Sequence, residues 1–276
     1  MSSKNYIIFT DLDGTLLDHE TYSFSKAKPA LEIIKQRKIP IILTSSKTRV
    51  EMADYQKEMG IETNPFIVEN GSAIYSNINF FENSEKGEIF KSYSRFCLGK
   101  TYSEIKNILT KISNEYGYTI KGFHNSDKQE IINQTNLNEE AVELAINREF
   151  SVPLFYNDKA EQILLKEIQK YNLKILYGGR FMHLLGETDK GRALDFVRNA
   201  YSKKWNSSKI TTIAIGDTLN DIAMLEKADI KILVKRFNNE YDKRVKIEKL
   251  IYSPYIGPKG WNKSLLEILN SGKNNG

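Results

Sequence analysis

The chain has 276 residues, of which 40% are hydrophobic and 27% charged, and its formal net charge is +5. This composition is typical of a folded globular protein, and no apolar run approaches the roughly 18 residues that a membrane-spanning helix needs. Cys97 is the single cysteine, which excludes an intrachain disulfide and a cysteine-rich zinc site and makes the cytoplasm the expected location.

The first part of the chain alternates short apolar runs with helical patterns. Residues 6–10, 39–44 and 66–69 predict strands, whereas residues 26–37 and 49–59 predict helices. Continuous apolar runs are typical of strands that are buried on both faces, and helices between such strands favour parallel pairing. The N-terminal part therefore predicts a parallel sheet with helices packed on it.

The same alternation returns near the end of the chain. Residues 189–201 and 218–228 predict helices, and residues 210–215 and 230–234 predict strands. Strand, loop, helix and strand again follow in this order. We therefore expect both ends of the chain to build one doubly wound α/β domain with a parallel sheet.

The middle of the chain has a different pattern, in which strands and helices do not alternate regularly. We interpret residues 84–185 as a smaller α+β domain inserted into a core made of residues 1–83 and 186–276. Thr101 and Glu104 have the spacing of a capping box at a helix start. The strand-like runs are 89–93, 118–123, 152–156 and 173–177, and the helical runs are 101–116, 138–149 and 159–171.

The strongest chemical signal is Asp11-Leu12-Asp13-Gly14-Thr15-Leu16, directly after the first strand. Carboxylates at the carboxyl end of such a strand face the crevice where open α/β sheets bind ligands. Two crowded acids repel each other and need a cation, a hydrogen-bond network or a shared proton. Mg²⁺ suits such a site and leaves positions for phosphate oxygens, while one acid attacks phosphorus and the other exchanges a proton. A solvated acidic turn is the alternative interpretation.

A second acidic motif, Gly216-Asp217-Thr218-Leu219-Asn220-Asp221, follows the strand at 210–215. Asp217 is in position to complete a metal site with the first motif. Asp221 and Asn220 fall in the first helical turn, where they can support that site. Asp and Asn also favour helix N-caps, which is the alternative explanation for this motif.

Two further segments predict contacts with phosphate. Thr44-Ser45-Ser46-Lys47-Thr48-Arg49 follows the second strand, and its hydroxyls and helix-start amides can cradle an anion, although Ser46 or Thr48 can equally serve as a helix cap. Lys190 lies at a helix start, where the helix dipole disfavours a cation. Its position favours a role in neutralising phosphate over that of a surface lysine.

These four motifs, in this order, resemble the haloacid dehalogenase superfamily of phosphatases. The resemblance implies that Asp11 is the nucleophile and a metal ligand, and that Asp13 is the general acid and base, with its backbone carbonyl on the metal. It implies that Ser45 and Lys190 hold the transferring phosphoryl group. Asp217 and Asp221 are assigned to the Mg²⁺ site, and the insert resembles the larger α/β cap of the superfamily, which closes over substrate.

A narrower resemblance is to the mannosyl-3-phosphoglycerate phosphatase family, which removes phosphate from a glycosylated phosphoglycerate to leave a compatible solute. It rests on Ser45–Arg49, Glu69–Ile74, Arg148–Ser151 and the run from Gly178 to His183. It implies a small phosphorylated sugar-acid as the partner. The residues assigned to substrate are Lys47, Thr48, Arg49 and Asn220 from the core and Arg148, Arg180 and His183 from the cap.

Other functions fit the motifs less well. A phosphatase for a hexose or sucrose phosphate is the main alternative, followed by a phosphomutase and a non-catalytic binding module that keeps the fold. No dense basic block with interleaved aromatic residues indicates nucleic-acid binding. The Gly/Pro-rich segment 253–263 predicts either a lining of the site or a cover for the sheet, and the oligomeric state is not predicted.

Overall fold

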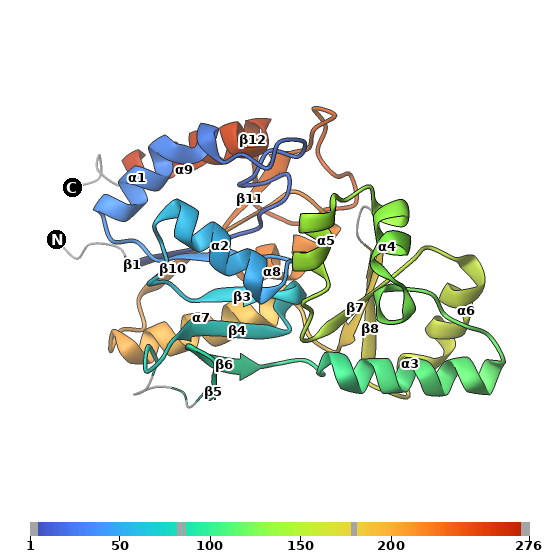
Figure 1. The fold of residues 1–276 in the computed structure, drawn as a ribbon. Helices are drawn as coiled ribbons and strands as arrows, with labels where there is room; N and C mark the ends of the chain where they lie inside the picture. Colours follow the sequence, from blue (N-terminus) through green and yellow to red (C-terminus); the bar gives the residue numbers. More distant parts are fainter. Residues whose placement is uncertain (1–4, 82–84, 86, 178–180, 272–276) are drawn as a thin grey trace.

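The computed structural model describes residues 5–81, 85, 87–177 and 181–271. Its main element is a nine-stranded sheet with the order β12-β11-β10-β1-β2-β3-β4-β6-β5 (Figure 1). Neighbouring strands are parallel from β12 to β3 and antiparallel from β3 to β5. The strands are β1 (Asn5–Thr10), β2 (Ile41–Thr44), β3 (Phe66–Val68), β4 (Ala73–Asn77), β5 (Glu88–Phe90), β6 (Tyr93–Cys97), β10 (Ile210–Gly216), β11 (Ile230–Lys235) and β12 (Leu250–Ile256).

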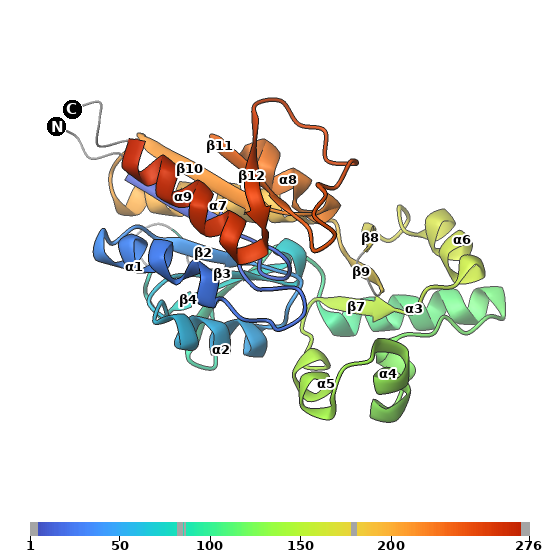
Figure 2. The ribbon, with the colours of Figure 1, turned by 90° about the horizontal axis from the view of Figure 1, so that it is seen from above.

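Helices cover both faces of this sheet (Figures 1 and 2). On β1, Ile8 joins one apolar cluster, whereas Ile7 and Phe9 join the cluster on the opposite face. This alternation explains why the strands are apolar throughout, and it confirms the doubly wound α/β core. One face carries α1 (Lys28–Gln36), α2 (Arg49–Met59) and α9 (Gly257–Ser271), and the other carries α7 (Lys190–Lys204) and α8 (Ile222–Lys227).

A smaller unit lies beside the large sheet, at the right of Figure 1. Its antiparallel sheet has the order β7-β9-β8, and it has an apolar cluster of its own. We call this unit the cap. Its strands are β7 (Ser151–Leu154), β8 (Leu173–Tyr177) and β9 (Met182–Gly186), and its helices are α3 (Tyr102–Tyr116), α4 (Lys128–Thr135), α5 (Glu139–Ala145) and α6 (Asp158–Glu167).

Four short 3₁₀ turns complete the described elements: η1 (Ser25–Ala27), η2 (Glu69–Gly71), η3 (Phe123–Asn125) and η4 (Leu219–Asp221). Within the described part of the chain, no helix is both long and apolar enough to cross a membrane.

The sheet extends further along the chain than the insert boundary at residue 84 implied. Strands β5 and β6 pair with each other, and β6 pairs with β4 of the large sheet. From this pairing we propose that the cap begins after Cys97 and ends at Gly186. Residues 118–123 do not form the expected strand and contribute only the Gly122–Leu154 bridge. The helix expected over 138–149 ends at Ala145.

The Gly/Pro-rich segment 253–263 forms the end of the edge strand β12 and the start of α9. Trp261 is fully buried, and its Nε1–H donates a hydrogen bond to Thr10 Oγ1 at 2.9 Å. A Cβ on Gly257 would lie 3.6 Å from the carbonyl oxygen of Gly14. The segment thus forms the edge of the sheet and the start of α9, and Trp261 links it to the end of β1.

Candidate active site

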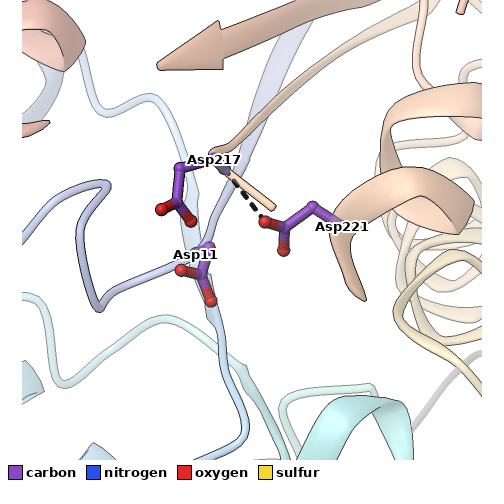
Figure 3. Close-up of side chains that lie close together, drawn as sticks. All are labelled: Asp11, Asp217 and Asp221. Atoms are coloured by element: carbon purple, nitrogen blue, oxygen red, sulfur yellow. Dashed lines mark hydrogen bonds between the residues drawn. The ribbon is translucent and has the colours of Figure 1, made fainter. Parts of the chain in front are cut away.

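The two acidic motifs meet because β1 and β10 are parallel neighbours. Thr10 pairs with Ile215, so both strands end at the same edge of the sheet. Asp11 N–H donates to the carbonyl of Ile215 at 2.9 Å, and Asp217 follows β10 directly. Figure 3 shows Asp11, Asp217 and Asp221 with their carboxylates facing a common point.

These three acids form a buried cluster. One carboxylate oxygen from each lies within 4.8 Å of the others. The loop that follows β1 can approach Asp217 this closely because residue 14 is glycine. Its φ is +78°, and a Cβ at this position would lie 2.8 Å from Asp217 Oδ2. Thr15 Oγ1 donates to Asp217 Oδ1 at 3.3 Å. The first motif therefore supplies both a carboxylate and the turn that packs against the second motif.

Lys190 compensates part of this negative charge. Its Nζ donates to Asp11 Oδ1 at 2.6 Å and to Asp221 Oδ1 at 2.7 Å, and its side chain is fully buried. Burial alone lowers the pKa of Lys190, but Asp11 and Asp221 more than offset this effect and raise it above its usual value. The lysine at the start of α7 is therefore a charged partner of the acids, which explains a cation at that unfavourable helix position.

The negative charge of the acids is only partly neutralised, because a single ammonium, that of Lys190, lies beside three carboxylates. Burial raises the pKa of Asp11 to about 7, with Lys190 opposing the shift and Asp221 and Asp13 adding to it. Burial and the charge of Asp11 also raise the pKa of Asp217 well above its usual value. A divalent cation would remove this repulsion and keep both carboxylates ionised.

The donor set fits Mg²⁺, which prefers carboxylate oxygens and keeps positions open for phosphate. Asp221 differs from the other two acids because both of its oxygens have partners: Lys190 on Oδ1, and the backbone N–H groups of Asp217 and Thr218 on Oδ2 at 3.0 and 3.2 Å. This geometry suits Asp221 to orienting Lys190 and the Asp217 loop. Asp11 and Asp217 are better suited to contact the ion directly.

Asp13 lies at the rim of this cluster, and Lys47 holds its side chain. Lys47 Nζ is 3.0 Å from Asp13 Oδ1 and 3.8 Å from Glu51. The ammonium also lies 5.2 Å from the ring centroid of Tyr22 and 5.7 Å from that of Tyr55. Lys47 therefore orients the carboxylate to which the family resemblance assigns the role of general acid and base.

Ser45 and Thr48 occupy the loop between β2 and α2. Both side chains are buried, and Ser45 Oγ accepts a hydrogen bond from the Lys47 N–H at 3.3 Å. Thr48 is the N-cap of α2 in a reciprocal capping box with Glu51, and its hydroxyl also reaches the carbonyl of Leu144 in the cap at 3.2 Å. The helix-cap interpretation thus holds for Thr48.

Two of the cap residues assigned to substrate keep unpartnered polar atoms. Arg148 Nη1 donates to the Ser46 carbonyl at 2.9 Å and to Ser151 Oγ at 3.2 Å. Burial, with a further contribution from Arg148, lowers the pKa of His183 to about 3, so its ring is neutral. Arg148 Nε and His183 Nδ1 are buried and have no hydrogen-bond partner within the described residues. Arg180 lies outside the described residues.

Arg49 and Asn220 have partners outside the Asp11, Asp217 and Asp221 cluster. Arg49 Nε pairs with Glu149 at 3.0 Å, and its guanidinium lies over the rings of Tyr75 and Phe90. Asn220 Nδ2 lies 3.5 Å from Asn70 Oδ1. Both residues therefore connect parts of the scaffold, and direct contact with substrate stays a prediction for them.

Sequence reasoning gave no role to Glu69, although its carboxylate is fully buried beside Arg148. The residues Glu69-Asn70-Gly71 stood out only as part of a family motif. Asn followed by Gly is a signal for left-handed backbone, which could have indicated a tight turn here. The partners of Glu69 in the cap could not be read from that signal, because they are about 80 residues away in the sequence.

Residues 8–248 match the family of haloacid dehalogenase-like hydrolases. A glucosyl-3-phosphoglycerate/mannosyl-3-phosphoglycerate phosphatase of Persephonella marina is 42% identical, over 96% of this chain and 97% of its own length. The protein of the same description from Methanococcoides burtonii is 36% identical, over 98% of each chain. A crystal structure from Streptococcus mutans has the same fold, with a TM-score of 0.67 at 20% identity, over 97% of this chain and all of its own. The chain belongs to the family of haloacid dehalogenase-like hydrolases.

Proposed function

We propose that this protein is a Mg²⁺-dependent phosphatase that hydrolyses glucosyl- or mannosyl-3-phosphoglycerate through a phospho-aspartate on Asp11. The observation that carries the proposal is the acidic cluster clamped by Lys190, at the carboxyl ends of two adjacent strands. Two relatives named for this activity match nearly the whole chain.

The residues divide the chemistry between them. Asp11, Asp217 and the Asp13 carbonyl would hold Mg²⁺, which would supply positive charge for the phosphate oxygens when bound. Lys190 engages Oδ1 of Asp11, which leaves Oδ2 to attack phosphorus in line. Lys190 and Ser45 steady the phosphoryl oxygens, and positioning of this kind supplies most of the rate in phosphoryl transfer.

Asp13 moves the protons in both halves of the reaction. It gives its proton to the leaving glycerate oxygen as the phosphorus–oxygen bond breaks and phosphate remains on Asp11. It then takes a proton from water, whose oxygen attacks phosphorus and releases inorganic phosphate and free Asp11. Lys47, whose Nζ lies 3.0 Å from Asp13 Oδ1, fixes the position of this carboxyl group at the rim of the site.

The cap supplies groups that suit a sugar-acid. Arg148 is buried and keeps Nε unpaired within the described residues, as His183 keeps Nδ1. An arginine can bind a carboxylate such as that of glycerate through charge-assisted hydrogen bonds. A neutral histidine can donate a hydrogen bond to a sugar hydroxyl or accept one from it. Arg180 is proposed to contribute to the same surface.

The first test is phosphate release, with and without Mg²⁺, from glucosyl- and mannosyl-3-phosphoglycerate, hexose phosphates and sucrose phosphate. Preference for a glycosyl phosphoglycerate supports the proposal. Preference for a hexose or sucrose phosphate would keep the chemistry and replace the substrate. Asp11→Asn should abolish turnover in a folded protein, and Asp54→Asn, at an exposed position of α2, is the matched control. Full activity in Asp11→Asn would contradict the mechanism.

A non-catalytic binding module is disfavoured because each of the four motifs keeps its chemical group. We place the enzyme in the cytoplasm, since a chain with one cysteine needs no oxidising compartment. Its partner is a small phosphorylated sugar-acid, and neither nucleic acid nor a membrane has a role.

A further inference from the structure

The turn Glu69–Gly71, which follows β3, has an unusual backbone. Three consecutive residues have a positive φ: +47° at Glu69, +60° at Asn70 and +91° at Gly71. Such conformations are unfavourable for residues other than glycine and persist where the surroundings fix them, often at functional sites. We therefore expect the residues that contact this turn to have a functional role.

The backbone of the turn supports the loops that carry the chemistry. Glu69 N–H donates to the Lys47 carbonyl at 3.1 Å, and Asn70 N–H donates to the Ser45 carbonyl at 2.9 Å. On the other side, Thr188 Oγ1 donates to the Gly71 carbonyl at 2.9 Å, two residues before Lys190. One turn thus supports both phosphate-binding segments.

The side chain of Glu69 points to the cap instead. Its fully buried carboxylate accepts hydrogen bonds from the N–H groups of Glu149 at 2.8 Å, Phe150 at 3.2 Å and Ser151 at 2.7 Å, and from Ser151 Oγ at 2.6 Å. A buried carboxylate is costly unless it is paired and hydrogen-bonded, and this one has four donors and a nearby guanidinium. The carboxylate is therefore built to hold the cap segment that leads into β7.

Arg148 completes the connection. Its Nη1 lies 3.8 Å from Glu69 Oε2 and donates to the Ser46 carbonyl at 2.9 Å. The same guanidinium keeps Nε unpaired within the described residues. Glu69 is thus in a position to set where Arg148 stands relative to the loop at Ser45–Lys47.

We propose that Glu69 is a positioning residue, which locks cap residues 148–151 onto the phosphate-binding loop and so presents Arg148 to the part of the substrate beyond the phosphate. The proposal rests on the proposed phosphatase function. It requires no contact between Glu69 and the substrate. Loss of the carboxylate should lower kcat/KM much more for substrates that reach the cap than for substrates that consist of little beyond the phosphate ester.

The test compares Glu69→Gln with the wild type on glucosyl-3-phosphoglycerate and on p-nitrophenyl phosphate. Glutamine keeps the volume and the backbone but loses the charge, and its amide N–H₂ opposes the N–H donors. We expect kcat/KM to fall about 10- to 100-fold for the sugar substrate, the usual effect of losing charged hydrogen bonds, and less than about threefold for the small one. Glu167→Gln changes a carboxylate of the cap that accepts a hydrogen bond from Tyr116 at 2.9 Å, and should change kcat/KM on neither substrate.

Equal losses on the two substrates would show a general effect on the fold and would overturn the proposal, as would unchanged kinetics. If Glu69→Gln does not fold, Ser151→Ala removes one donor at 2.6 Å and should show a smaller loss with the same preference. A wild type that ignores glycosyl phosphoglycerates would refute the proposed substrate separately. The comparison would then use the sugar phosphate that the wild type hydrolyses best.

Discussion

At the scale of single residues, the acidic cluster combines functional need with a cost to stability. Asp11, Asp217 and Asp221 are buried together, and Lys190 pairs with only two of them. Sequence patterns could predict the cluster, because Asp11 and Asp217 each follow a strand of the same sheet and Asp221 precedes the next helix. The same patterns could not show that both oxygens of Asp221 have partners, because that depends on how Lys190 packs from another helix.

Asp217→Asn should stabilise the metal-free protein and abolish its response to Mg²⁺. The substitution removes a charge that burial and Asp11 make unfavourable, so we expect the free energy of unfolding in EDTA to rise. Thermal unfolding should show Tm rising with Mg²⁺ in the wild type and in Asp54→Asn, but not in Asp217→Asn. A normal Mg²⁺-induced increase of Tm in Asp217→Asn would show that this acid does not hold the ion.

His183 should make the protein less stable in mild acid. Burial lowers its pKa in the folded protein to about 3, whereas an unfolded histidine has a pKa of about 6.5. The unfolded chain therefore binds the proton first, and the free energy of unfolding falls as the pH drops below the unfolded pKa.

Between pH 7.5 and 5.5, this histidine should account for a loss of about 1.4 kcal/mol, which His183→Gln should abolish. Urea unfolding of both proteins at the two pH values measures the difference. His124, whose pKa burial lowers to about 4, acts with the same sign, so the variant should retain a remaining slope. Identical pH dependence in variant and wild type would contradict the burial of a neutral imidazole.

At the scale of elements, local patterns predicted the core well and its edges less well. The strand at 210–215 is a mostly apolar run, and the helix at 49–59 has a capping box and a C-terminal glycine. Both elements form as expected. Strand β12 escaped prediction because Pro254 interrupts its pattern, and an edge strand tolerates proline that a central strand would not. Residues 118–123 look strand-like, but they pair only at Gly122. Pairing partners, which lie far away in sequence, decide such cases.

Gly71→Ala should be much more damaging than Gly117→Ala, although both glycines have a positive φ. A Cβ on Gly71 would lie 2.2 Å from the Asp189 carbonyl, whereas nothing lies within 4 Å of a Cβ on Gly117. We expect a loss of about 1 kcal/mol at Gly117 and about 3 kcal/mol or more at Gly71 in urea unfolding.

The Gly71 change should also displace Lys190, which follows Asp189 directly, and lower kcat. The Gly117 change, at the end of α3, should leave kcat unchanged. Similar losses of stability in the two variants would mean that the turn can relax away from Asp189 without cost.

At the scale of the whole molecule, the sequence predicts an insert but does not predict how the insert docks. Cap and core have apolar clusters of their own, so each unit has a reason to fold. The docking contacts join Arg49 to Glu149, and Glu69 to residues 149–151, across 80 or more positions of the chain. The residue pattern of the core or of the cap does not reveal such pairs, because they depend on how the two folded domains are oriented relative to each other.

Phe150 should be the apolar anchor of this docking. It precedes β7 of the cap, yet it is fully buried in the apolar cluster that α1, α2 and α9 share with the large sheet. Phe150→Ala removes contacts worth about 3–5 kcal/mol. Because the cluster inside the cap stays intact, we expect this loss to fall on docking more than on the folding of the cap itself.

Small-angle X-ray scattering of Phe150→Ala should show a larger radius of gyration than the wild type, and limited proteolysis should cut near residues 98–101 or 187–189. Phe123→Ala is the control, because Phe123 packs in an apolar cluster of cap residues. It should lower stability while leaving the scattering curve unchanged. An unchanged radius in Phe150→Ala would mean that the polar contacts of Glu69, Arg148 and Glu149 hold the cap closed without the ring, and Glu69→Gln would then be the variant expected to open it.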